Sequence, residues 1–195
     1  TVFKKESNII FTDNLYFNFI PYKWLAGSPR AALDAPGKVV LTESRAKKYF
    51  PDTDLNNIIG KNIVFADTLT ARVTGIVKDL DQVTDFTFQT FISYATVEKQ
   101  LKGEWGSVTS SSQFLVRLKK GVDPKKINEQ IAAIRKKNEK DAYLATDHYL
   151  QPLKDIHFNA EFDNFDQRIG HKPTLYGLLA VAAFLLLLGC INFIN

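Results

Sequence analysis

Glycine–lysine pairs are the first residues to test for chemistry, because a lysine in a glycine-rich loop can hold the phosphates of a nucleotide. The sequence has two such pairs, Gly37-Lys38 and Gly60-Lys61. Neither has the upstream glycine or the following serine or threonine that a phosphate-binding loop requires. The dinucleotide pattern Gly-x-Gly-x-x-Gly also does not occur. The sequence therefore predicts that this chain does not hydrolyse ATP and is not an enzyme of that class.

Metal-ligating side chains are few and scattered along the chain. The three histidines, His148, His157 and His171, show no i, i+4 pairing and have no cysteine nearby. The single cysteine, Cys190, excludes an intrachain disulfide and a cysteine-rich zinc site. We therefore interpret the histidines as interfacial or core residues, and we predict neither a metal site nor a cofactor.

Two further groups resemble functional motifs only in part. Glu161, Asp163 and Asp166 form an acidic run, but it lacks the glycine and the terminal glutamate of a calcium loop, so we predict a solvated loop. The run Ser110-Ser-Ser112 is not part of a Gly-x-Ser-x-Gly nucleophile motif, and a flexible loop explains it better.

Aromatic residues cluster early in the chain and could form a stacking platform for a ligand. Residues of this kind are far more often core or a subunit contact, and we predict that they are core. No catalytic, cofactor-binding or metal residue is therefore predicted, and the function must follow from the architecture. The cluster consists of Tyr16, Phe17, Phe19, Tyr22 and Trp24.

Composition limits the class of protein. The 195 residues are 45% hydrophobic and 24% charged, which is typical of a globular protein and excludes disorder along the whole chain. A net charge of +4 is too small a bias to predict nucleic-acid binding. Because the chain begins with Thr1 and contains no methionine, we expect a fragment or a processed product.

The last part of the chain is strongly apolar. No charged residue follows Lys172, and residues 173–195 are long enough to cross a bilayer core of about 30 Å as a helix. Tyr176 lies near the start, where an amphipathic ring suits the headgroup region. A buried helix of a soluble protein is the alternative, but such helices usually show a polar stripe. We predict a transmembrane helix over 174–195, and its position around Cys190 argues against thiol catalysis.

The remaining sequence predicts an α+β fold. Capping is clearest at Thr42, which precedes a helix that Pro51 stops. Short strands separated by turn residues dominate the middle of the chain. The expected elements are a strand leading into a short helix or turn within 8–20, a strand at 38–42 with a helix at 43–50, a hairpin of 62–66 and 69–78, a strand at 86–92, a short helix at 96–102, and a β–α–β unit of 113–118, 125–140 and 149–153.

Several segments resemble the extracytoplasmic domain of MacB-type, or FtsX-like, ABC transporter permeases. The resemblance is based on residues 25–33 (LAGSPRAAL), 39–50 (VVLTESRAKKYF), 59–61 (IGK), 73–79 (VTGIVKD), 151–157 (QPLKDIH) and 190–195 (CINFIN). Each segment alone is weakly specific. Together they run along nearly the whole chain in the order that the family shows.

This resemblance implies a periplasmic core domain between two membrane helices. It would contain a porter-like α/β subdomain, N-terminally truncated, at 1–57 and 107–157. A β-rich inserted subdomain would occupy 58–106, and a juxtamembrane connector would span 158–173. The helix over 174–195 would be the second membrane helix, entering from the periplasmic side. Residues 1–173 would then lie in the periplasm, outside a bacterial inner membrane.

The resemblance also implies a function. A permease of this type couples ATP hydrolysis in the cytoplasm to export or extraction of a substrate at the outer face of the inner membrane. Its expected partners are an ABC ATPase, fused or separate, a second permease chain, membrane lipid and a periplasmic protein, but no nucleic acid. We expect Asp163 to Lys172 to couple the domain to the helix. The alternatives are a membrane-anchored sensor or binding module and, less favoured because no nucleophile or metal cluster occurs, an anchored hydrolase.

Overall fold

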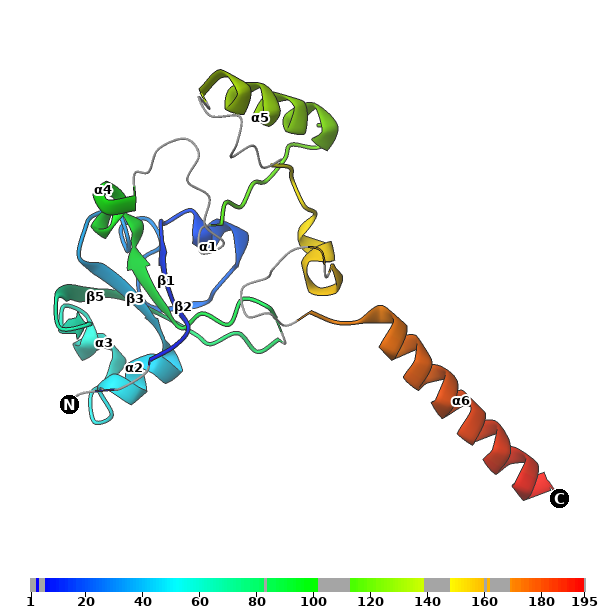
Figure 1. The fold of residues 1–195 in the computed structure, drawn as a ribbon. Coiled ribbons are helices and arrows are strands. Elements are labelled where there is room, and N and C mark those ends of the chain that lie inside the picture. The colour runs from blue at the N-terminus through cyan, green and yellow to red at the C-terminus, as the bar shows by residue number, and fades with distance from the viewer. Residues whose placement is uncertain are drawn as a thin grey trace.

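The computed structural model describes residues 3, 6–82, 84–101, 113–138, 148–159, 161 and 169–194. In these residues the chain forms a mixed sheet with helices, an α+β fold, and helix α6 extends away from it (Figure 1). The elements are β1 (Ile9–Thr12), α1 (Tyr16–Phe19), β2 (Trp24–Gly27), β3 (Lys38–Thr42), α2 (Glu43–Tyr49), α3 (Leu55–Ile58), β4 (Asn62–Phe65), β5 (Leu69–Val77), β6 (Thr90–Ser93), η1 (Tyr94–Thr96), α4 (Glu98–Leu101), α5 (Pro124–Asn138), η3 (Leu153–Phe158) and α6 (Lys172–Ile194).

The sheet has the strand order β1-β6-β3-β5-β2, and β4 pairs with β5 beside this path. Strands β1 and β6 are parallel, as are β3 and β5, whereas the other pairs are antiparallel. Strand β3 lies in the middle of the sheet, and its Val39, Val40 and Leu41 are all fully buried. Successive side chains of a strand point to opposite faces, so both faces of the sheet must be covered at β3.

Two apolar clusters cover these two faces. On one face, Val40 packs with aromatic side chains that come from α1 and the segment after it. On the other face, Val39 and Leu41 pack with Ala46 of α2 and Ile58 of α3. The continuous apolar run of β3 is therefore a strand covered on both sides.

Several predicted elements are confirmed. The Thr42 hydroxyl accepts a hydrogen bond from the Arg45 backbone N–H at 3.4 Å, as expected of an N-cap. Helix α2 ends at Tyr49, before Pro51. The early strand and short helix, the hairpin of β4 and β5, the short helix α4 and helix α5 are also present.

The predicted β–α–β unit around α5 differs from the structure. Residues 113–118 and 149–152 do not form strands, and 153–158 form the 3₁₀ helix η3. Strand β2 was not predicted at all. A strand forms only where a partner satisfies its backbone, and none of the described strands pairs with 113–118 or 149–152.

The predicted division at residue 57 does not separate two sheets. Strands β5 and β6 come from the segment predicted as an inserted subdomain, yet β5 pairs with β3 and β6 pairs with β1. In the described residues, strands from both sides of this boundary therefore belong to one sheet. The division into porter-like and inserted subdomains stays a prediction.

Glycine is required where β2 turns beside β5, and this gives a testable prediction. Gly27 has φ +80°, and a Cβ there would lie 2.4 Å from the backbone oxygen of Thr74. Gly60 has a similar φ of +88°, with no atom within 4 Å of a Cβ. We expect Gly60→Ala to lower the free energy of unfolding by about 1–2 kcal/mol through left-handed strain alone. Gly27→Ala should lower it by about 1–3 kcal/mol more, because the backbone of β5 must also move.

The measurement is urea unfolding of the full chain in detergent, followed by tryptophan fluorescence. Gly60→Ala is the matched control, because it shares the backbone conformation but not the contact. Equal losses of stability in the two variants would mean that the sheet accommodates a side chain at Gly27.

Candidate functional site

None of the candidate metal ligands in the described residues come together as a group of three or more. His148 is exposed, His157 lies in η3, and the Nδ1 of His171 lies 2.7 Å from the Thr174 hydroxyl. Glu161 is exposed, and the rest of the acidic run and the serine run lie outside the described residues. Cys190 is an exposed residue of α6.

The two glycine–lysine pairs serve local structure. The Gly37 N–H donates to the Thr96 hydroxyl at 3.0 Å, and Lys38 forms an ion pair with Asp34. The Lys61 ammonium lies 5.4 Å from the centre of the Phe50 ring. Each lysine is thus engaged with its own protein, which is consistent with the lack of a phosphate-binding sequence.

The predicted aromatic cluster is part of the core. Tyr16, Phe17 and Tyr22 are each 7% exposed and belong to one buried cluster with Phe91 of β6. The Phe17 and Trp24 rings meet edge to face, with their centroids 5.0 Å apart. The interpretation as core, rather than as an exposed stacking platform, is confirmed for these four predicted residues, whereas Phe19 is half-buried and lies outside the cluster.

Helix α6 is long and apolar enough to cross a membrane by length and composition. It spans 23 residues, and none of its most apolar stretch is buried inside the protein. Aliphatic side chains are exposed all around it, for example Leu179, Leu185 and Leu186. A helix that is apolar on every side needs an apolar environment, which fits the predicted transmembrane helix.

The residues just before α6 contact the sheet part through a short chain of interactions. The β5–β6 loop, residues 78–89 with residue 83 outside the described part, carries Asp85. The Nδ1 of His157 in η3 lies 3.1 Å from the Asp85 carboxylate. The backbone oxygen of His157 in turn accepts a hydrogen bond from the Gly170 N–H at 2.7 Å. Gly170 is thus connected to the β5–β6 loop two residues before α6 begins.

Side-chain packing reinforces this connection. A Cβ on Gly170 would lie 2.8 Å from the Phe158 ring and 3.1 Å from the Nε2 of His157. The Lys172 ammonium, at the first position of α6, lies 5.1 Å from the centre of the same Phe158 ring. We call Asp85, His157, Phe158, Gly170 and Lys172 the junction.

The junction overlaps only in part with the sequence-predicted coupling segment. Of Asp163 to Lys172, residues 163–168 lie outside the described part, and the structure places Gly170 and Lys172 in the contact. Asp85 was missed, because it is 72 residues from His157 and no local pattern connects them. His157, immediately before the predicted connector, was the available signal for this half of the junction.

The N-terminal segment reaches the same loop through a buried ion pair. Arg45 is 5% exposed and donates to the Glu6 carboxylate, to the Ser7 backbone oxygen at 2.9 Å and to the Gln89 side-chain oxygen at 2.7 Å. The Gln89 N–H also donates to the Asn8 backbone oxygen at 2.9 Å. Residues 6–8 are therefore held against the end of the β5–β6 loop.

Glu6 has two further partners on α2. Its carboxylate accepts from Lys48 at 2.6 Å and from the Tyr49 hydroxyl at 3.3 Å. The chain entering the sheet part and the chain leaving it toward α6 thus contact the second half of one loop, at Gln89 and at Asp85.

The sequence matches one known protein family. Residues 1–134 match the model of a family described as the MacB-like periplasmic core domain. This match covers more than half of the chain and ends inside α5, so α6 lies beyond it. No curated protein matches the sequence.

Solved structures also resemble the chain, to different degrees. One is a domain from Porphyromonas gingivalis whose parent protein is provisionally assigned as a permease, with 16% identity, a TM-score of 0.53, and coverage of 84% of this chain and 72% of that chain. Another is the periplasmic region of MacB from Actinobacillus actinomycetemcomitans, with 22% identity and a TM-score of 0.45. The aligned part covers 67% of this chain and 58% of that MacB region.

Proposed function

The chain belongs to the family of the MacB-like periplasmic core domain, and we propose that it is part of a permease subunit of an ABC transporter. In this proposal the sheet part lies on the periplasmic side of a bacterial inner membrane and α6 crosses that membrane. The subunit couples ATP hydrolysis in the cytoplasm to export or extraction of a substrate at the outer face of the membrane.

The observation that carries this proposal is the junction, combined with the family match. A coupling domain needs a mechanical connection between its membrane helix and its folded part. The contacts from Gly170 to His157 and from His157 to Asp85 provide one across three separate segments of the chain. A domain that was only tethered to the membrane would need no such packing beside the helix.

ATP hydrolysis is assigned to a partner or a fused ATPase domain rather than to these residues. The support is the engagement of Lys38 and Lys61 in local contacts and the lack of a phosphate-binding sequence. ATP binding would favour one of two arrangements of the membrane helices, and α6 would carry this difference to the sheet part. A dimer of permease chains and contact with membrane lipid are parts of the same proposal.

The test is affinity purification of the tagged, full-length protein from detergent, with mass spectrometry of what copurifies. We expect an ATPase with a phosphate-binding loop, either as a separate chain or fused to this one. Recovery of a kinase, or of no nucleotide-binding partner and no fused ATPase, would instead favour a membrane-anchored sensor or binding module.

A further inference from the structure

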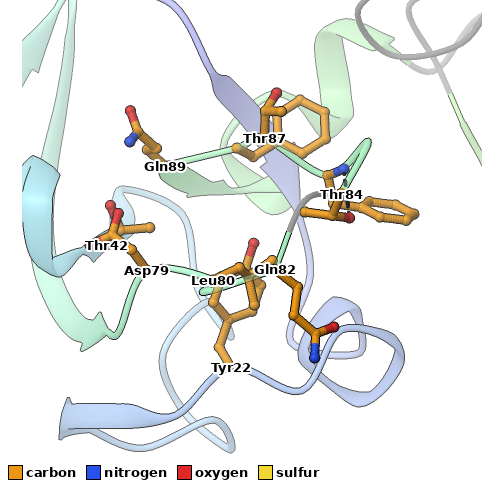
Figure 2. Close-up of a pocket in the computed structure, with 10 residues that line it drawn as sticks. Tyr22, Thr42, Asp79, Leu80, Gln82, Thr84, Thr87 and Gln89 are labelled. Atoms are coloured by element: carbon orange, nitrogen blue, oxygen red, sulfur yellow. Dashed lines mark hydrogen bonds between the residues drawn. The ribbon is translucent and has the colours of Figure 1, made fainter. Parts of the chain in front are cut away.

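A cavity of about 330 Å³ lies under the β5–β6 loop (Figure 2). Its size is at the lower end of the range of about 300–1,000 Å³ that is typical of small-molecule sites. Most of its wall comes from the loop, while Tyr22 and Thr42 come from neighbouring segments. The lining residues are Tyr22, Thr42, Asp79, Leu80, Gln82, Thr84, Phe86, Thr87, Phe88 and Gln89.

The Tyr22 side chain supplies an unused polar group. Figure 2 shows Tyr22 rising from below, with its hydroxyl directed toward the middle of the ring of lining residues. Tyr22 is 7% exposed, and within the described residues its buried hydroxyl has no partner at good hydrogen-bond geometry, although the Tyr16 hydroxyl is near enough to lower the pKa of Tyr22. Buried hydroxyls are nearly always hydrogen-bonded, so an unpartnered one beside a cavity indicates that a bound group completes it.

The electrostatics of the cavity favour a positive ligand. Burial raises the pKa of Tyr22 to about 12, and the Asp79 carboxylate contributes to the rise, which indicates that its charge acts on the phenol. Residues 79–89 contain three aspartates and neither lysine nor arginine. Lys78 precedes this stretch and points to Asp81, with which it forms an ion pair at 2.8 Å. An anion in the cavity would therefore meet the Asp79 charge, whereas a cation is attracted by it.

Asp79 is held in place independently of any ligand. Its carboxylate accepts from the Ser44 backbone N–H at 2.8 Å and from the Ser44 hydroxyl at 2.5 Å. Aromatic rings of Tyr22, Phe86 and Phe88 line the same cavity, and aromatic faces attract organic cations. The wall thus combines a fixed negative charge, aromatic rings and a phenol oxygen that can accept a hydrogen bond.

We propose that this cavity binds a small organic cation with an ammonium group, which donates a hydrogen bond to the Tyr22 hydroxyl and lies near the Asp79 carboxylate. The occupied cavity would hold the β5–β6 loop in one position. Since the same loop carries Asp85 of the junction, binding would also affect α6, and this consequence alone rests on the proposed function.

The test uses the full chain in detergent and isothermal titration calorimetry with spermidine as the probe. We expect saturable binding that Tyr22→Phe weakens about tenfold, because a hydrogen bond to a charged group is lost. Tyr22→Phe should change the thermal unfolding midpoint little, since the hydroxyl has no partner at good hydrogen-bond geometry among the described residues. Asp79→Asn keeps a group that accepts from Ser44 and should also weaken binding.

The matched control is Asp67→Asn, which removes an exposed aspartate in the turn between β4 and β5. It should leave spermidine binding unchanged, and glutamate should not bind to the unmodified protein. The proposal is overturned if spermidine does not bind, if Tyr22→Phe binds it as tightly as the unmodified protein, or if Asp67→Asn weakens binding as much as Asp79→Asn does.

Discussion

A flexible glycine–serine linker inserted after Gly170 should abolish the ATP-dependent change in the sheet part while leaving assembly with the ATPase intact. The insertion separates α6 from the contact that the Gly170 N–H makes with His157, and from the Phe158 ring that packs on Gly170. A movement of α6 would then be absorbed by the linker. The measurement is hydrogen exchange of the β5–β6 loop in the reconstituted complex, with and without ATP, together with copurification of the ATPase.

The matched control is the same linker after Gly121, in an exposed turn where no atom lies within 4 Å of a Cβ. This variant should retain the full ATP-dependent change. His157→Ala should reduce the change only in part, because it removes the Asp85 contact but keeps the backbone bond to Gly170. A full response with the linker after Gly170 would show that coupling does not pass through the junction.

Replacing Arg45 by alanine should lower the free energy of unfolding by about 3–5 kcal/mol. The reason is that Glu6, only 14% exposed, would lose its most buried ionic partner, and the Ser7 oxygen and Gln89 side chain would each lose a donor. Lys48 still pairs with Glu6, so we expect the lower half of this range. Urea unfolding of the full chain in detergent, followed by tryptophan fluorescence, measures the difference.

The control for this prediction is Lys47→Ala, two residues further along α2 on its exposed side. Lys47 is 62% exposed and pairs with Glu43, so its loss should change stability by at most about 0.5 kcal/mol. Arg45→Lys should fall between the two, because it keeps the charge but loses the planar group that reaches three partners at once. A change as small as that of Lys47→Ala for Arg45→Ala would mean that Glu6 finds other partners.

Local elements were predictable wherever their cause lies within a few residues. Thr42 caps α2 because its hydroxyl reaches a backbone N–H three positions later, and any chain with this spacing can do the same. The run at β3 is apolar at consecutive positions, which indicates a strand covered on both faces. The aromatic residues around Tyr16 were recognisable as core by their type alone.

The segment around α5 shows where local pattern is insufficient. Residues 113–118 have the composition of a strand. Whether they form one depends on a neighbouring strand to pair with, which these residues do not specify. The converse holds for Trp24–Gly27, where turn-forming residues follow closely and the strand forms because β5 is available for pairing.

The short-range features were therefore predictable from the residues alone: the helix starts, the hairpin of β4 and β5, and an apolar helix that suits a membrane. Three features became visible only in the folded chain: β1, β3, β5 and β6 share one sheet, Glu6 pairs with Arg45, and Asp85 contacts His157. The cause is the separation along the chain over which each kind of interaction acts. Periodicity and capping act over one or two turns of chain, whereas these pairs are 39 and 72 residues apart and meet only because the strand order brings them together.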